Sequence, residues 1–232
     1  DKNLIIDPND NLILRALEEF RNLTNWRKYF SIYLEKKIPI GAGLGGGSAD
    51  AAATLIFLRK LFNHETKINK VSKKVLFEIG KLLGSDVPAC IESKDLKLKG
   101  YGDKFFRNKT PDGFYFLIIN PNIQLSTKDI FICFDNIQNN KVEVSNISWG
   151  SINIQNSLLK PAIKLAPEIS DIINILENSK KIVAYGMTGS GSSCFGIFEN
   201  LSDINALLKC FNKKYFIWFG KKKNYSLNRV SY

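Results

Sequence analysis

The chain has 232 residues, a formal net charge of +11 and 44% hydrophobic residues, enough for one large core or two smaller ones. No apolar stretch has the length of a membrane span and no signal-peptide pattern opens the sequence, so we expect no membrane association. The lysines are spread along the chain and only Lys221–Lys223 form a dense run, so the charge alone does not favour specific binding of nucleic acid.

The first part of the chain is expected to be mainly helical. Apolar residues at helical spacing from Ile13 to Leu23 predict a helix that Asp10 caps. Apolar and polar residues then alternate between positions 30 and 35, which predicts a half-buried strand. Further helices of this part are predicted at residues 51–62 and 72–83.

The rest of the chain is expected to alternate between strands and helices. Pro88 cannot continue the preceding helix and predicts a short strand after it. The Asn-rich stretch 135–150 lacks periodicity and predicts a loop or linker. Further strands are predicted at residues 97–104, 114–119, 182–185, 192–198 and 215–219. Further helices are predicted from Ser126 or Thr127 to about Phe134, and at residues 151–165, 167–178 and 202–213.

This order of elements predicts the fold class. Helices on one face of a largely antiparallel sheet, twice over, are typical of an α+β protein rather than of a doubly wound α/β protein. We expect two domains, one at residues 1–135 and one at residues 136–232.

Cysteine and histidine do not indicate a metal centre. The only histidine is His64, and the cysteines are scattered without the paired spacing of zinc ligands. Reduced, buried thiols in a cytosolic protein are the expected state. The cysteines are Cys90, Cys133, Cys194 and Cys210.

A glycine-rich stretch that runs into an alanine-rich helix is the most informative motif. Residues 41–47 contain five glycines, and Ser48 follows as a natural N-cap. Glycine lets the backbone adopt positive φ and lets a ligand approach the main chain. A helix N-terminus behind such a loop offers free N–H groups and a partial positive charge, which suit phosphate oxygens. The local prediction is a phosphate-binding loop, and the alternative is a turn that joins a strand to a buried helix.

The two best-known nucleotide motifs do not fit this stretch. Residues 41–46 match G-x-G-x-x-G, but a dinucleotide fold needs an acidic residue at a strand end about 20 positions on. Glu65 stands at that distance but follows a helix. A P-loop needs a lysine before the serine, where this chain has Gly47.

Two further motifs stand at separate places in the sequence. Gly84–Pro88 is a tight turn that holds Asp86. A second glycine loop runs from Gly186 to Gly191 and is followed by Ser192 and Ser193. Taken alone, Asp86 could be a helix-end residue bonded to the next turn, and the second loop could be a hairpin turn.

Together the three stretches resemble the three motifs of the GHMP kinase superfamily. The residues that carry the resemblance are Ile38–Ala52, Leu83–Pro88 and Met187–Gly196, in the order of the family. The resemblance implies a two-domain architecture with a ribosomal S5 domain 2-like N-terminal domain and a ferredoxin-like C-terminal domain. It implies ATP and Mg²⁺ as cofactors. Within the superfamily the chain is most similar to the kinases of isoprenoid biosynthesis whose substrate is a cytidine diphosphate-linked methylerythritol.

The resemblance also implies roles for individual residues. Asp86 would be the catalytic base on the acceptor hydroxyl. Thr127 and Phe131 would border the cytidine end of the substrate, and Thr188, Gly189, Ser190 and Gly191 would close the substrate site. The metal ligands stay unknown. The ATP phosphates would be held by Pro39, Ile40, Gly41, Ala42, Gly43, Leu44, Gly45, Gly46, Gly47, Ser48 and Ala49.

The chain departs from the family pattern at its beginning. Members of the family open with a strand that carries a catalytic lysine, and no lysine here stands in such a motif. We expect the sequence to be part of a longer chain, with an inactive, degraded protein as the alternative. A bacterial cytoplasm or a plastid stroma is the expected location, and a monomer or homodimer the expected state.

Two other functions stay open from the sequence. The acceptor could be that of another GHMP kinase, such as mevalonate or homoserine. A non-catalytic, basic α+β module that binds nucleic acid is the candidate from a different class, because fold alone does not decide function.

Overall fold

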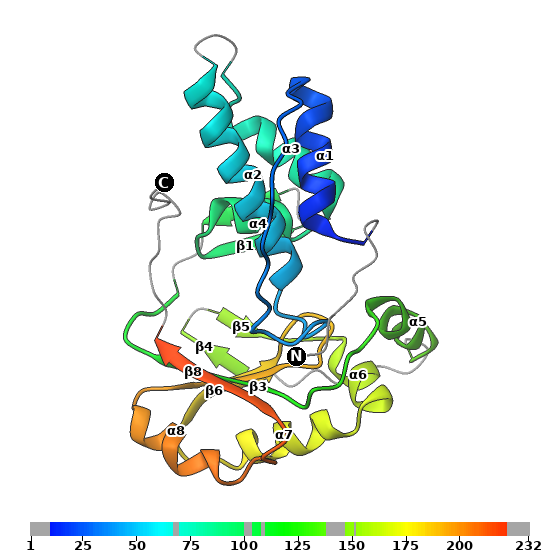
Figure 1. The fold of residues 1–232 in the computed structure, drawn as a ribbon. Helices are drawn as coiled ribbons and strands as arrows, with labels where there is room; N and C mark the ends of the chain where they lie inside the picture. Colours follow the sequence, from blue (N-terminus) through cyan, green and yellow to red (C-terminus); the bar gives the residue numbers. More distant parts are fainter. Residues whose placement is uncertain are drawn as a thin grey trace. The chain divides into compact units, whose positions relative to one another are not determined.

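The structure is a computed structural model that describes residues 10–66, 70–99, 104–107, 110–137, 147–150 and 152–221. The chain divides into two compact units, which Figure 1 draws and which are described separately here. The first unit consists of Asp1–Leu34, Gly45–Lys109 and Asn224–Tyr232. The second consists of Glu35–Leu44 and Thr110–Lys223. The glycine-rich stretch thus passes from the second unit to the first between Leu44 and Gly45.

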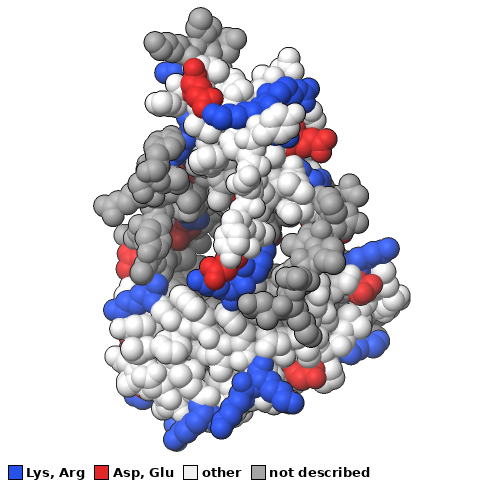
Figure 2. Space-filling view, viewed as in Figure 1, with Lys and Arg blue, Asp and Glu red and all other residues white. Residues whose placement is uncertain are grey.

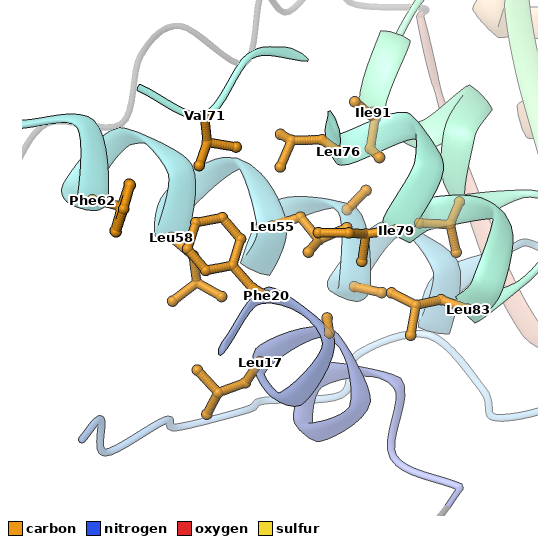
Figure 3. Packing of buried hydrophobic residues seen from close by; sticks show 14 residues of the cluster. Leu17, Phe20, Leu55, Leu58, Phe62, Val71, Leu76, Ile79, Leu83 and Ile91 are labelled. Atoms are coloured by element: carbon orange, nitrogen blue, oxygen red, sulfur yellow. The ribbon is translucent and has the colours of Figure 1, made fainter. Parts of the chain in front are cut away.

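In its described residues the first unit is a small bundle of helices with one β-hairpin. Its core forms where α1, α2, α3 and α4 meet, and Figure 3 shows the side chains that fill it. Phe20, Leu55 and Leu76 are fully buried there, each worth about 1.5–3 kcal/mol of hydrophobic stabilisation. The helices are α1 (Leu12–Thr24), α2 (Gly46–Glu65), α3 (Lys73–Leu83) and α4 (Val87–Glu92), and the antiparallel hairpin pairs β1 (Leu96–Lys99) with β2 (Lys104–Arg107).

The beginning of α1 differs from the prediction by one residue. Asn11, not Asp10, is the N-cap, because its side-chain oxygen accepts a hydrogen bond from the amide of Ile13 at 3.0 Å. The apolar stripe is confirmed from Ile13 to Phe20, whereas Leu23 lies in the last turn and is 56% exposed. Helical spacing therefore located the buried face but not its end.

The strand predicted at residues 30–35 is wrong. Residues 25–38 form neither helix nor strand, and no described strand pairs with them. Alternating polarity does not suffice for a strand, because a strand also needs a hydrogen-bonded neighbour. Phe30 instead packs edge-on against Trp26, with ring centroids 5.6 Å apart.

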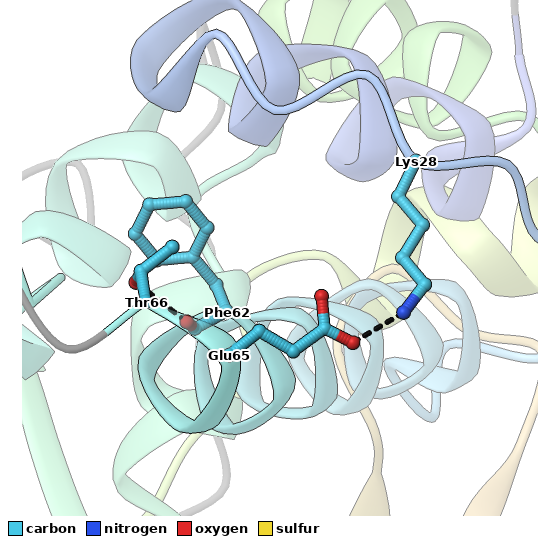
Figure 4. A network of polar contacts seen from close by, with 4 residues as sticks. All are labelled: Lys28, Phe62, Glu65 and Thr66. Carbon is cyan, nitrogen blue, oxygen red and sulfur yellow. Dashed lines mark hydrogen bonds and ion pairs between the residues drawn. The ribbon is translucent and has the colours of Figure 1, made fainter.

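An ion pair ties this segment to the end of α2. Lys28 contacts Glu65, as Figure 4 shows, and Thr66 caps the same helix end by donating its hydroxyl to the carbonyl of Phe62 at 2.6 Å. Both charged side chains are partly exposed, so the pair contributes little to stability beyond fixing the path of the chain.

The strand predicted after Pro88 is also wrong, because residues 87–92 form the short helix α4. Pro88 stands in the first turn of that helix, where the missing N–H costs no intrahelical hydrogen bond. The preceding helix α3 is confirmed, with Ser72 as N-cap and Gly84 as C-cap. A helix whose second residue is Pro88 therefore stands where the sequence predicted a strand.

The second unit is built on an antiparallel sheet with the strand order β6-β7-β3-β8. Along β3, Leu117 and Ile119 face a core shared with the helices, while Phe116 faces Trp149 on the other side, with ring centroids 5.7 Å apart. The strands are β3 (Tyr115–Asn120), β6 (Ile182–Met187), β7 (Cys194–Phe198) and β8 (Phe216–Lys221). The hairpin β4 (Ile147–Trp149) with β5 (Ile152–Ile154) and the helices α5 (Thr127–Ile137), α6 (Leu159–Leu165), α7 (Glu168–Glu177) and α8 (Leu201–Leu208) complete it.

Three element boundaries in this unit correct the sequence predictions. The predicted loop at 135–150 contains the end of α5 and strand β4, while residues 138–146 lie outside the described part. The helix predicted at 151–165 is strand β5 followed by α6. Helix α8 follows Asn200 rather than a Ser202 cap and ends at Leu208. Strands as short as β4 and β5 contain too few residues for a period to be recognised.

The α+β class is confirmed, since helices and an antiparallel sheet make up the second unit and helices with a hairpin the first. A four-stranded sheet occurs in one of the two units among the described residues, so the expected repetition of the sheet is not seen there. The predicted domain boundary between residues 135 and 136 stays a prediction.

None of the described helices combines the length and the apolar character that crossing a membrane requires. Lys and Arg side chains lie at several separate places on the face shown in Figure 2, with Asp and Glu among them.

Candidate functional site

The first glycine loop has the backbone conformation that its glycines were expected to provide. Gly41, Gly43 and Gly45 all have positive φ, between 66° and 69°. Residues with a Cβ rarely adopt this left-handed conformation, so alternate glycines let the chain turn tightly before α2.

Helix α2 begins earlier than predicted. Its N-cap is Gly45, which makes no side-chain cap hydrogen bond, and the first helical bond runs from the Ala49 amide to the Gly45 carbonyl at 2.9 Å. Ser48 is therefore the third residue of the helix and not its cap. The amides of Gly46, Gly47 and Ser48 precede that first bond, so they have no partner within the helix.

The space around this helix start is open. A Cβ added at Gly45 or at Gly46 would meet no atom within 4 Å, whereas one at Gly47 would meet the Cδ1 atom of Leu12 at 3.4 Å. A ligand can therefore approach the main chain at Gly45 and Gly46 closely. A phosphate group fits this arrangement because its oxygens accept from backbone amides and are attracted by the positive end of the helix dipole.

The second glycine loop joins β6 to β7 and is held by its own hydrogen bonds. The amide of Thr188 donates to the Ser193 carbonyl at 2.9 Å, and the amide of Gly191 donates to the Thr188 carbonyl at 2.9 Å. Gly189 and Gly191 both have positive φ. Ser192 and Ser193, at the end of the loop, are completely buried.

The two glycine loops meet within the second unit. The amide of Ser193 donates to the carbonyl of Ala42 at 3.2 Å. A Cβ on Gly43 would lie 2.5 Å from the Gly191 carbonyl oxygen and 2.6 Å from that of Thr188, closer than real contacts allow. Glycine at position 43 is thus required by the other loop as well as by its own φ. The structure brings together Ala42 and Gly43 of the first motif with residues 188–193 of the third.

Two asparagines that sequence reasoning missed anchor the second loop. The Asn156 amide group donates to the carbonyls of Met187 at 2.9 Å and Gly189 at 2.8 Å. The Asn120 amide group donates to the hydroxyls of Ser192 at 3.1 Å and Ser193 at 2.9 Å. In the sequence Asn120 marked only the end of a strand, and Asn156 lay within a wrongly predicted helix.

Thr127 and Phe131, which were expected to border the substrate, both lie on α5. The hydroxyl of Thr127 lies 3.1 Å from that of Ser190, so the start of α5 meets the second glycine loop. Phe131 stands one helical turn later and is 50% exposed, so its ring is available to a ligand. Ser126 caps the helix by accepting from the amide of Asp129 at 3.3 Å.

Asp86 is exposed and belongs to the first unit, at the N-cap of α4. Within the described part of the chain its carboxylate makes no cap hydrogen bond to α4, and the Ser85 hydroxyl lies 3.5 Å from it. Asp86 therefore stands at a helix end, where its backbone carbonyl accepts from the amide of Cys90 at 3.1 Å, but its carboxylate does not act as the cap. Burial raises the pKa of the Cys90 thiol one turn later, and the nearby Asp86 carboxylate raises it further.

Helix α4 fixes Asp86 relative to α2. Val87 is fully buried in the same core as Ala51 and Ala52 from the first turns of α2. The Asp86 carboxylate and the start of α2 are thus carried by two helices that pack directly on each other.

The described residues contain no group of three or more His, Cys, Asp or Glu side chains that could hold a metal ion. Mg²⁺ is commonly bound through phosphate oxygens, water and one or two carboxylates, so its use needs no such group. The cysteines are free: Cys133 and Cys194 are buried as expected, whereas Cys90 is half-buried and Cys210 exposed.

Two family models match the chain. The GHMP kinases N terminal domain matches residues 11–94, which include the first glycine loop and Asp86. The GHMP kinases C terminal model matches residues 142–217, which include the second glycine loop.

Curated relatives and solved structures agree with these matches. The 4-diphosphocytidyl-2-C-methyl-D-erythritol kinase of Ehrlichia canis is 34% identical over 211 residues, covering 86% of this chain and 72% of the relative. The enzyme of the same name from Thermodesulfovibrio yellowstonii is 31% identical over 230 residues, covering 91% and 77%.

Among solved structures, a 4-(cytidine 5'-diphospho)-2C-methyl-D-erythritol kinase is similar with a TM-score of 0.73 and 25% identity, covering 94% of this chain and 80% of that one. A homoserine kinase from Cytophaga hutchinsonii has a TM-score of 0.67 at 16% identity, covering 95% and 79%, and so shares the fold.

Proposed function

Because this chain belongs to the GHMP kinase family, and within it to the 4-diphosphocytidyl-2-C-methyl-D-erythritol kinases, we propose that it transfers the γ-phosphoryl group of ATP to the 2-hydroxyl of 4-diphosphocytidyl-2-C-methyl-D-erythritol. The reaction belongs to non-mevalonate isoprenoid precursor biosynthesis. The observation that carries the proposal is the open helix start at Gly45 and Gly46, where an added Cβ would meet no atom within 4 Å.

In this proposal the stretch from Pro39 to Ala49 holds the ATP phosphates. Its backbone amides and the positive end of the α2 dipole stabilise negative charge on the phosphate oxygens, and they need no rearrangement during the reaction. Phosphoryl transfer passes through a loose transition state, so positioning and charge stabilisation carry most of the catalysis. Bound Mg²⁺ would neutralise phosphate charge as the γ-phosphoryl group leaves.

Asp86 is the proposed general base. An exposed carboxylate that is not used to cap its own helix can accept the proton of the acceptor hydroxyl, and such catalysis is worth about 10²- to 10⁴-fold. The mechanism asks of Asp86 only that it orient that hydroxyl and take its proton while the oxygen attacks phosphorus.

Residues of the second unit are proposed to recognise the acceptor. Thr127 and Ser190 present hydroxyls 3.1 Å apart, and Phe131 presents an exposed ring on the same helix as Thr127. Hydroxyls can bond the hydroxyls or phosphates of the substrate, and an aromatic ring can stack on a nucleobase. Thr188, Gly189 and Gly191 belong to the same proposed surface. The location in a bacterial cytoplasm or plastid stroma, and the state as monomer or homodimer, stay predictions.

A coupled assay across three acceptors tests the proposed function. The purified full-length protein is given ATP and Mg²⁺ with 4-diphosphocytidyl-2-C-methyl-D-erythritol, mevalonate or homoserine, and ADP release is measured. We expect ADP release with the first acceptor alone. Turnover of only mevalonate or homoserine would overturn the substrate assignment but would still support kinase activity.

A binding measurement separates the kinase from the nucleic-acid module. We expect ATP to raise the unfolding temperature, because a ligand that binds only the folded state stabilises it. No protection by ATP, together with RNA affinity that falls steeply with salt, would favour the nucleic-acid module instead.

A further inference from the structure

Three polar side chains are buried in the part of the chain that the structure describes, and all three lie together. Asn120 is 1% exposed, and Ser192 and Ser193 are completely buried. Asn120 ends β3, and the serines end the second glycine loop immediately before β7. Burying a polar group costs free energy unless it is hydrogen-bonded, so the placement of this group is specific.

Both the nitrogen and the oxygen of the Asn120 carboxamide have hydrogen-bond partners. Both hydrogens of its amide nitrogen are donated, to the hydroxyls of Ser192 and Ser193. Its carbonyl oxygen accepts from the amide of Asn122 at 2.7 Å, and the Ser192 hydroxyl in turn donates to the carbonyl of Ile123. A satisfied buried network of this kind admits one arrangement of its members.

The network ends on the first glycine loop. Ser193, whose side chain Asn120 holds, donates its backbone amide to the carbonyl of Ala42 at 3.2 Å. The carbonyl of Ser193 accepts from the amide of Thr188 at 2.9 Å, which closes the second loop. One side chain therefore fixes the residue that joins the two loops.

We propose that Asn120 is a positioning residue of the kinase, which holds Ser193 in place and, through the Ser193 amide, fixes the stretch Ile40–Leu44 for the phosphates of ATP. The inference rests on the proposed function, because it assigns those phosphates to that stretch. Asn120 itself does not touch the reacting atoms. Its effect passes through one backbone hydrogen bond, from Ser193 to Ala42.

Packing alone does not require this trio. Apolar side chains of similar shape can replace a hydrogen-bonded buried set at little cost in stability. Asn120, Ser192 and Ser193 instead fix positions, because the Asn120 amide nitrogen holds both serine hydroxyls at hydrogen-bond distance. Removing the hydrogens of the Asn120 side-chain amide should therefore disturb the two loops more than a truncation elsewhere in the core that lowers the free energy of unfolding equally.

The test compares three variants of the full chain. Asn120→Asp keeps the side-chain shape but removes both donors, and Ser193→Ala removes one acceptor, which provides a second route should the first variant fold poorly. Ile172→Val is the control, since Ile172 is a fully buried residue of α7 outside the network. Two quantities are measured: hydrogen exchange of the Ser193 and Thr188 amides without ligand, and the KM for ATP with kcat.

We expect both network variants to speed exchange of the Ser193 amide and to raise the KM for ATP about tenfold, the effect of about one lost buried hydrogen bond. Ile172→Val should lower the unfolding temperature without changing either quantity. Unchanged exchange at Ser193, or an unchanged KM for ATP despite faster exchange, would overturn the inference. Absence of ATP turnover by the wild-type full-length protein would instead refute the proposed function, which is a separate result.

Discussion

The backbone amide of Ser193 donates a hydrogen bond to the carbonyl of Ala42, 3.2 Å away, and so joins two glycine-rich loops that lie far apart in the sequence. The close approach continues at Gly189, where an added Cβ would stand 3.2 Å from the Gly43 carbonyl oxygen. A glycine in each loop thus leaves the space that the backbone of the other loop occupies. The second unit therefore presents the two loops as one structural element.

Alanine at position 43 should damage the protein far more than alanine at position 45. Both positions have positive φ, which costs a residue with a Cβ about 1–2 kcal/mol. Only at Gly43 would the new Cβ also collide with backbone oxygens, whereas at Gly45 it meets open space. Urea unfolding of the two variants measures the difference. Equal losses of unfolding free energy would contradict the contact between the loops.

Alanine at position 46 should weaken ATP binding without weakening the fold. The new methyl group would point into free space at the helix start, where the phosphate is proposed to bind. We expect the dissociation constant for ATP, measured by calorimetry, to rise at least about tenfold, while the unfolding free energy changes by less than about 0.5 kcal/mol.

Gly47→Ala is the comparison for that variant, because its methyl group would face the Cδ1 atom of Leu12 at 3.4 Å. It should weaken ATP binding less than Gly46→Ala does. If both variants bind ATP like the wild type, the phosphates do not lie at this helix start.

Replacing Asp86 by asparagine should abolish most turnover while leaving ATP binding intact. The amide cannot accept the proton of the acceptor hydroxyl, so kcat should fall at least about 10²-fold. Stability should hardly change, because the carboxylate does not cap α4. Glu78→Gln is a matched control, because Glu78 is an exposed residue of α3 that pairs with Lys81. Unchanged turnover in Asp86→Asn would remove Asp86 from the mechanism.

The Glu92 carboxylate should make the first unit more stable at neutral pH than in acid. Its hydrogen bond to Lys73 lowers its pKa below the ordinary 4.5 of a glutamate, and its hydrogen bond to Lys94 lowers the pKa further. Because the folded-state pKa is the lower one, the stabilisation is present above 4.5 and is lost as pH falls through the folded-state value.

Unfolding of the wild type and Glu92→Gln at neutral and acid pH measures this effect. We expect the variant to be less stable by about 0.5–1 kcal/mol at neutral pH, with the difference vanishing in acid. A difference that persists in strong acid would assign the loss to packing rather than to charge.

The sequence predicted those elements whose signal is long and local. The apolar run before Asn120 predicted β3, and helical spacing predicted α1 and α3. It failed where structure depends on a distant partner. Residues 30–35 alternate like a strand but have no described neighbouring strand, and Pro88 stands in the first turn of α4 instead of preventing a helix.

The glycines of the candidate site could be predicted from the sequence, but the residues that hold the loops in place, such as Asn120, could not. Composition alone indicated that residues 41–47 form a loop with positive φ at glycines. The role of Asn120 follows from strand register, because β3 pairs with β7 so that Ile119 lies opposite Cys194, which brings Asn120 to Ser193. No spacing within the sequence encodes that register, so the contact could be found only in three dimensions.

The most direct measurement for the proposed function is product analysis after incubation with ATP, Mg²⁺ and 4-diphosphocytidyl-2-C-methyl-D-erythritol. We predict a product that has gained one phosphoryl group on the 2-hydroxyl, located by phosphorus and carbon NMR, with one ADP formed for each product molecule. The same incubation with Asp86→Asn should give almost none. Phosphorylation at another hydroxyl, or ADP formed without a phosphorylated product, would contradict the account.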